Sequence, residues 1–147
     1  MMAGWAEALT PVQQSLATIA ISELVPNPPI TCSADETLAV VVDRLKEANQ
    51  GCALVCDEKG ELAGAFTDRD ILRVALLVKD LSEVTVGQCM WIKPLALRAD
   101  LPIARALHAF SVRNQRHLPL CDADNKPVGV ITTNHVVEFI KRRLAAE

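Results

Sequence analysis

Aromatic residues and positive charge are both scarce in this chain. It has no tyrosine, aromatic residues make up 3% of its 147 positions, and its formal net charge at pH 7 is −3. A nucleic-acid-binding surface needs a basic field and rings on which bases can stack. We therefore expect no nucleic-acid partner.

Long hydrophobic runs are missing as well, although 50% of the residues are hydrophobic. The aliphatic run from Leu38 to Val42 is far shorter than the about 20 apolar residues of a membrane-spanning helix. No lysine or arginine precedes Arg44, so a positively charged secretion signal is not expected either. These features predict a cytoplasmic protein with no membrane partner.

Cysteine usage gives little support for a metal site. The chain has five cysteines and no C-x-x-C motif, so reduced thiols packed as small apolar side chains are the expected state. Cys52 and Cys56 share one face of a predicted strand, as do His117 and Cys121, but two ligands on a strand are weak support for zinc. We expect no bound metal. The motifs of hydrolases and metalloproteases are also missing, so the chain is not predicted to be an enzyme.

An internal repeat at an offset of 65 positions (129 − 64) is the most informative feature. The stretch "GAFTDRDI" begins at Gly64 and "GVITTNHV" begins at Gly129. Without a gap, the same offset aligns further identical residues: Pro29 with Pro94, Asp35 with Asp100, Asn49–Gln50 with Asn114–Gln115, and Cys56–Asp57 with Cys121–Asp122. Such a constant register indicates a duplicated structural unit.

Both copies contain the same succession of predicted elements. Apolar spacing predicts helices at 37–49, 67–79, 102–114 and 133–145, and strands at 28–32, 52–56, 62–66, 94–98, 117–121 and 127–131. The fold class is therefore α/β, with two β-α-β-β-α repeats packed face to face about a pseudo-twofold axis. We expect a helical extension at 1–20, in which Thr10 and Pro11 begin a helix, then repeats at 21–82 and 83–147.

These two units resemble the cystathionine-β-synthase (CBS) domain pair, also called the Bateman module. The resemblance rests on the tandem units, on "G-apolar-apolar-T-x-x-D", and on the leading segments "ISELVPNPPITCSADETL" and "TVGQCMWIKPLALRADLPI". It runs from about Ile21 to the C-terminus. It implies a non-catalytic regulatory module. Family members commonly bind AMP, ADP, ATP or S-adenosylmethionine between the repeats and often form homodimers, whereas other members bind nothing.

The spacing of Thr67 and Asp70 matches a capping box, which explains both residues without a ligand. The resemblance adds that Asp70 takes the place of the family's ribose-binding acid and Thr67 that of its phosphate- or ribose-contacting hydroxyl. Gly64 permits close backbone approach, although a turn or tight packing explains a glycine equally well. The second copy has His135 where the first has the acid, so we expect a second site to bind adenosine ligands poorly or not at all.

Arg116 and His117 have no basic counterpart in the first copy. The resemblance implies that they reach phosphates held by the first repeat, and that adenine lies near Thr31 and Ala53. The alternative is that Arg116 faces solvent and His117 caps a strand end.

The predicted function is a regulatory module that senses an adenine nucleotide (AMP, ADP or ATP). The alternative is a ligand-free module that forms a homodimer or docks on a partner enzyme or transporter. The sequence does not specify which nucleotide binds.

Overall fold

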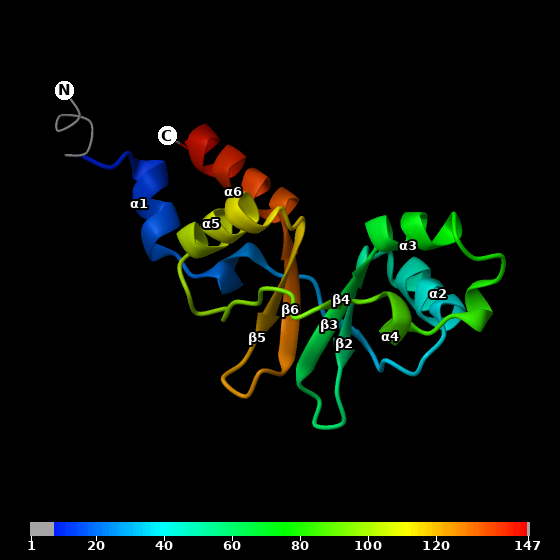
Figure 1. Ribbon diagram of the computed structural model, residues 1–147. Coiled ribbons are helices and arrows are strands. Elements are labelled where there is room, and N and C mark those ends of the chain that lie inside the picture. Colours follow the sequence, from blue (N-terminus) through cyan, green and yellow to red (C-terminus); the bar gives the residue numbers. More distant parts are fainter. Residues whose placement is uncertain (1–7, 147) are drawn as a thin grey trace.

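A computed structural model of the chain describes residues 8–146, which form two similar halves standing side by side (Figure 1). One half contains the four-stranded sheet β1-β2-β3-β4 and the other the two-stranded sheet β5-β6. Strand hairpins of the two halves meet in the middle, and helices cover the outer sides. The predicted α/β class with two paired repeats is confirmed. Positions 1–7 of the predicted N-terminal extension lie outside the described residues.

The first repeat follows the predicted order. Its elements are β1 (Ile30–Cys32), α2 (Leu38–Ala48), β2 (Cys52–Cys56), β3 (Leu62–Thr67) and α3 (Asp68–Ala75). β1 is parallel to β2, and β3 returns antiparallel to β2. The prediction that the last helix continues to Lys79 is wrong. Leu76 and Leu77 are 88% and 84% exposed, so no packed face supports a further helical turn.

The second repeat has only a remnant of the predicted strand at 94–98. Its elements are α5 (Ile103–Arg113), β5 (His117–Cys121), β6 (Pro127–Thr132) and α6 (Thr133–Ala146). Leu97 makes a single parallel bridge to Leu120. Pro119 has no N–H with which to continue this ladder. The buried side chain of Gln115 bonds both backbone groups of Leu95 instead, at 3.2 and 3.4 Å.

A short strand that the sequence did not predict extends the first sheet. β4 (Trp91–Ile92) pairs antiparallel with β3 and follows the short helix α4 (Val86–Cys89). A Cβ added at Gly64 would lie 2.7 Å from the sulfur of Met90 and 3.0 Å from the carbonyl oxygen of Trp91. The glycine therefore lets this segment pack directly on β3.

The leading segment of each repeat packs into the core of the other repeat. Ile21, in the 3-10 helix η2 (Ile21–Leu24), donates its N–H to Leu101 O at 2.8 Å and is buried with the second repeat. At the equivalent position, Val86 donates to Glu36 O at 2.9 Å and is buried with the first repeat. This reciprocal exchange ties the repeats together, as does Val130, which packs against β2 and β3.

Two residue pairs that are identical in the two copies have the same structural role in both. Asn49 and Asn114 follow α2 and α5 in the left-handed conformation, each with φ 53°. This is a common way to end a helix. The carboxylates of Asp57 and Asp122 each accept two backbone N–H groups of the following turn, at 2.9 and 3.0 Å. The matched positions therefore maintain the fold.

The N-terminal helix begins as predicted. α1 (Pro11–Thr18) follows Thr10, whose hydroxyl accepts the N–H of Gln13 at 3.1 Å. The helix lies against α5 and α6, and Leu16 packs against the core of the second repeat. A further 3-10 helix, η3 (Leu81–Glu83), connects the first repeat to α4.

Candidate functional site

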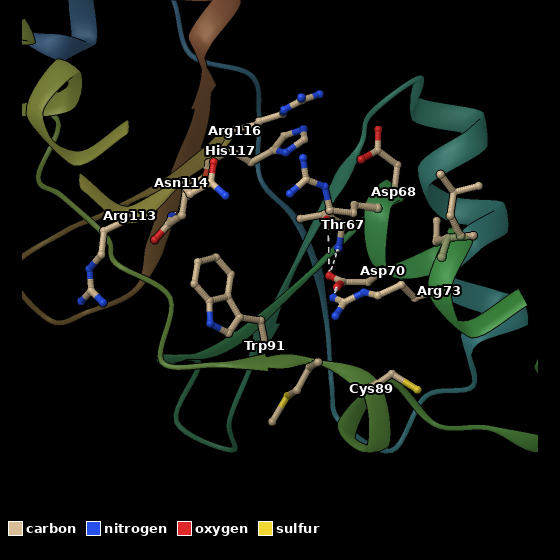
Figure 2. Close-up of a pocket in the computed structure, with 15 residues that line it drawn as sticks. Thr67, Asp68, Asp70, Arg73, Cys89, Trp91, Arg113, Asn114, Arg116 and His117 are labelled. Atoms are coloured by element: carbon tan, nitrogen blue, oxygen red, sulfur yellow. Dashed lines mark hydrogen bonds and ion pairs between the residues drawn. The ribbon is translucent and has the colours of Figure 1, made fainter. Parts of the chain in front are cut away.

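A cleft of about 870 Å³ lies between the two repeats. Its lining comes from three segments, which are the start of α3, the end of α4 with β4, and the connection from α5 to β5 (Figure 2). The lining residues are Thr67, Asp68, Arg69, Asp70, Ile71, Leu72, Arg73, Cys89, Met90, Trp91, Arg113, Asn114, Gln115, Arg116 and His117. Both repeats therefore contribute side chains to one cleft.

The start of α3 is held by the capping box that the spacing of Thr67 and Asp70 predicts. Asp70 accepts the Thr67 backbone N–H at 2.9 Å and the Thr67 hydroxyl at 3.1 Å, both on Oδ2. Its other oxygen forms an ion pair with Arg73. Asp70 is only 6% exposed, so this buried acid is fixed in position at the edge of the cleft.

The second copy repeats this cap with a histidine. The backbone N–H of Thr132 donates to Nδ1 of His135 at 2.9 Å. A backbone N–H can only donate, so Nδ1 carries no proton and the ring is the neutral Nε2–H tautomer. Burial lowers the pKa of His135, which favours the same neutral form. The histidine therefore replaces the aspartate as a helix cap but brings no negative charge.

His117 crosses from the second repeat to the first. A Cβ added at Gly51 would lie 3.1 Å from Nε2 of His117 and 2.9 Å from Oδ2 of Asp68, so the glycine leaves room for both side chains. Burial lowers the pKa of His117, the Asp68 carboxylate opposes this shift, and Arg116 adds to it. His117 is consequently neutral at pH 7 and can donate a hydrogen bond.

Positive charge collects in this cleft. Four arginines and two aspartates line it, which gives a formal charge of +2 with His117 neutral, while the whole chain carries −3. The arginines come from both repeats: Arg69, Arg73, Arg113 and Arg116. A cleft of this sign attracts anions.

The structure brings together four of the seven predicted site residues. Thr67, Asp70, Arg116 and His117 line the cleft, while Thr31, Ala53 and Gly64 do not.

Each of these three residues has a structural role elsewhere. The carbonyl of Thr31 accepts a hydrogen bond from Arg44 at 2.9 Å, and Ala53 is 0% exposed inside the first repeat. Gly64 lies under Met90.

Sequence reasoning did not identify Met90, Trp91 and Arg113 as lining residues. Arg113 could have been found by the comparison that found Arg116, because the first copy has Ala48 at the position equivalent to Arg113. Trp91 stands out in a chain with 3% aromatic residues. Its position in the cleft depends on β4, however, and no periodic pattern predicted that strand.

The thiols offer no alternative centre in the part of the chain that the structure describes. All five cysteines are free, and burial raises the pKa of Cys52 to about 12. Cys89 lines the cleft, and burial raises its pKa as well. Among residues 8–146 no group of three or more His, Cys, Asp or Glu side chains is placed to hold a metal ion. Within the same range no helix has the length and apolar character needed to cross a membrane.

The fold and the cleft define a pseudo-symmetric α/β module of two repeats. The family model described as "CBS domain" matches the chain twice, at residues 21–77 and 82–142. The chain therefore belongs to the CBS domain family and carries two copies of the domain in tandem, as the sequence resemblance predicted.

Similar proteins include an enzyme and CBS domain proteins of known structure. Arabinose 5-phosphate isomerase KdsD of Pseudomonas aeruginosa is 34% identical over 87 residues, which cover 59% of this chain and 27% of the isomerase. The CBS domain pair of protein MJ0100, solved with 5′-methylthioadenosine and S-adenosyl-L-methionine, has a TM-score of 0.77 and 20% identity, covering 86% of this chain and 98% of that one. The CBS domain protein PAE2072 of Pyrobaculum aerophilum, complexed with AMP, has a TM-score of 0.76 and 22% identity, covering 88% and 100%.

Proposed function

We propose that this chain is a regulatory module that binds an adenosine-containing nucleotide, of the AMP, ADP or ATP class, in the cleft between its repeats and senses the level of that nucleotide. The observation that carries the proposal is the pairing of one fixed carboxylate, Asp70, with four arginines in the same cleft. A carboxylate can accept the two hydroxyls of a ribose, and guanidinium groups bind phosphate. A nucleotide has both groups.

Each part of the cleft has a matching part of the ligand. Asp70 accepts ribose hydroxyls, while Thr67 lies on the phosphate side, at the positive end of the α3 helix dipole. Arg116 and neutral His117 approach the phosphates from the other repeat. The ring of Trp91 and the side chain of Met90 offer an apolar surface to the base.

The complexes of structural neighbours support this ligand class. PAE2072 was solved with AMP, and MJ0100 with two adenosine derivatives. Both proteins share the fold of this chain. Because they are only 22% and 20% identical to it, the ligand of this chain has to be inferred from its own cleft residues.

The proposed role is regulatory and not catalytic. The match to the isomerase covers 27% of that enzyme, so most of the enzyme lies outside it. We propose that this chain acts through a homodimer or a partner enzyme or transporter. Leu72 on α3 and Leu76 and Leu77 in the turn after it favour an interface there, because they are 70%, 88% and 84% exposed. Its five free cysteines suit a reducing cytoplasm.

A thermal-shift panel tests the proposal. AMP, ADP, ATP, S-adenosylmethionine and NAD are each added to the purified chain at several concentrations. A ligand present at about 100 times its Kd stabilises the protein by about 2.7 kcal/mol, which is readily seen in melting. The proposal predicts a shift with at least one of the first three, lost in Asp70→Asn. No shift with any of the five would leave the alternative, a ligand-free dimerisation or docking module.

A further inference from the structure

The carboxylate of Asp70 is already bonded on both of its oxygens. Oδ2 accepts two hydrogen bonds from Thr67, at 2.9 and 3.1 Å. Oδ1 forms an ion pair with the guanidinium group of Arg73, one turn further along α3 (Figure 2). A carboxylate has about four lone-pair sites, two on each oxygen. Three are therefore in use, and a ribose with two hydroxyls finds one open site.

Arg73 is the partner that can leave. Its side chain is 72% exposed, whereas that of Asp70 is 8% exposed. Rotation of Arg73 away from the acid disturbs no core packing and leaves the Thr67 hydrogen bonds intact. Once Arg73 has moved, both sites on Oδ1 are open to a ribose diol.

A phosphate group gives Arg73 a new partner. Guanidinium groups bind phosphate through parallel N–H donors. In a 5′-nucleotide the phosphate and the diol are carried by one ribose, so both reach the arginine-lined cleft together. A nucleoside brings the same hydroxyls but no anion, and it displaces Arg73 without offering a replacement.

We propose that Arg73 is a specificity-determining residue, which exchanges Asp70 for the phosphate of the ligand and so selects nucleotides over nucleosides. This inference rests on the proposed function of the cleft. It adds how the cleft distinguishes a nucleotide from a nucleoside. The second copy differs at both members of the pair, with His135 at the position of Asp70 and Glu138 at that of Arg73. Glu138 lies 3.7 Å from Lys141 instead. The acid and its arginine both line the cleft, whereas His135 and Glu138 do not.

Calorimetric titration of AMP and of adenosine into the wild type, Arg73→Gln and Arg69→Gln tests this exchange. Arg69 is the matched control, because it lines the same cleft and makes no ion pair within residues 8–146. We expect Arg73→Gln to weaken AMP binding about tenfold and to strengthen adenosine binding about three- to tenfold. Arg69→Gln weakens AMP binding and leaves adenosine binding within about twofold. Arg73→Lys restores part of the AMP affinity.

The outcomes separate this inference from the proposed function. If Arg73→Gln weakens both ligands equally, or leaves adenosine binding unchanged, the exchange is wrong, while AMP binding to the wild type still upholds the nucleotide site. If the wild type binds neither ligand, the nucleotide site itself is wrong and the exchange falls with it. Circular dichroism of each variant confirms that the fold is retained.

Discussion

The backbone N–H of Thr132 donates to Nδ1 of His135 at 2.9 Å, the same distance as from the Thr67 N–H to Oδ2 of Asp70. Two different side chains thus cap equivalent helices in the two repeats. The duplicated motif therefore has a helix cap in both copies, but the capping residue is negatively charged only in the first copy. Of the two capping side chains, only Asp70 lines the cleft.

Removal of this cap should destabilise the second repeat. We expect His135→Ala to lower the free energy of unfolding by about 0.5–2 kcal/mol, because the Thr132 N–H loses its acceptor. His135→Asp supplies the acceptor found in the first repeat and should stay close to the wild type. Urea unfolding followed by circular dichroism measures both, with exposed His108→Ala as the control. Equal destabilisation by His135→Ala and His135→Asp would show that the cap does not matter.

Acid should destabilise the fold below about pH 6.5. Burial lowers the pKa of both His117 and His135 below the ordinary value of 6.5. Their neutral forms contribute full stability above the unfolded-state pKa. As the pH falls below it, the unfolded chain takes up protons that the folded chain resists, so stability is lost. Urea midpoints at pH 7.5 and 5.5 measure this loss, which should shrink in the double variant His117→Gln, His135→Asn. If the double variant loses as much stability at pH 5.5 as the wild type does, groups other than these two histidines cause the acid destabilisation.

The strongly periodic elements of the fold were predictable because a local pattern encodes each of them. α2, β2, β3 and their counterparts carry apolar residues at a helical or strand period. The strand at 94–98 was predicted wrongly, since the apolar pattern does not show that Pro119 lacks the N–H needed to pair with Leu95. β4 was missed because it has only two residues, both exposed, and so shows no apolar periodicity. Its pairing with β3 depends on the tertiary fold.

Gly51 should be needed for binding more than for folding. A methyl group there meets Asp68 and His117 at 2.9 and 3.1 Å, so Gly51→Ala pushes His117 away from the cleft. We expect AMP affinity to fall about three- to tenfold, which corresponds to about 0.7–1.4 kcal/mol. Gly60→Ala is the control. Its φ of 82° makes it cost about 1–2 kcal/mol of stability, and it lies outside the cleft, so its AMP affinity should not change. Unchanged AMP affinity in Gly51→Ala would remove His117 from the site.

The exposed leucines of α3 and of the turn after it should support self-association. We expect a dimer at micromolar concentration and a shift to monomer in Leu76→Glu, because a buried unpaired carboxylate opposes the interface. Val128→Glu is the matched control, since Val128 is 50% exposed on β6 and lies outside α3. Sedimentation velocity measures both. A wild-type monomer at high micromolar concentration would contradict the homodimer.

The residues of the cleft were predictable where the two copies differ within a recognisable motif. Asp70 and His135 occupy equivalent positions in a repeated motif. Arg116 and His117 are aligned with the uncharged residues Gly51 and Cys52. The predicted adenine wall at Thr31 and Ala53 came from resemblance alone. In the structure Thr31 is exposed and its carbonyl accepts a hydrogen bond from Arg44, while Ala53 lies in the core. One sequence does not encode such tertiary contacts.

The central claim is that each chain has one nucleotide site, and that Asp70 is its ribose-binding acid. Calorimetric titration of AMP into the wild type, Asp70→Asn and His135→Ala tests it most directly. Asp70→Asn keeps an oxygen that can cap Thr67 but removes the charge, and the lost charge-assisted hydrogen bonds correspond to about 1.5–3 kcal/mol, roughly ten- to a hundredfold in affinity. The account predicts one site per chain in the wild type and in His135→Ala, and little or no binding in Asp70→Asn. Full binding by Asp70→Asn together with loss in His135→Ala would contradict it.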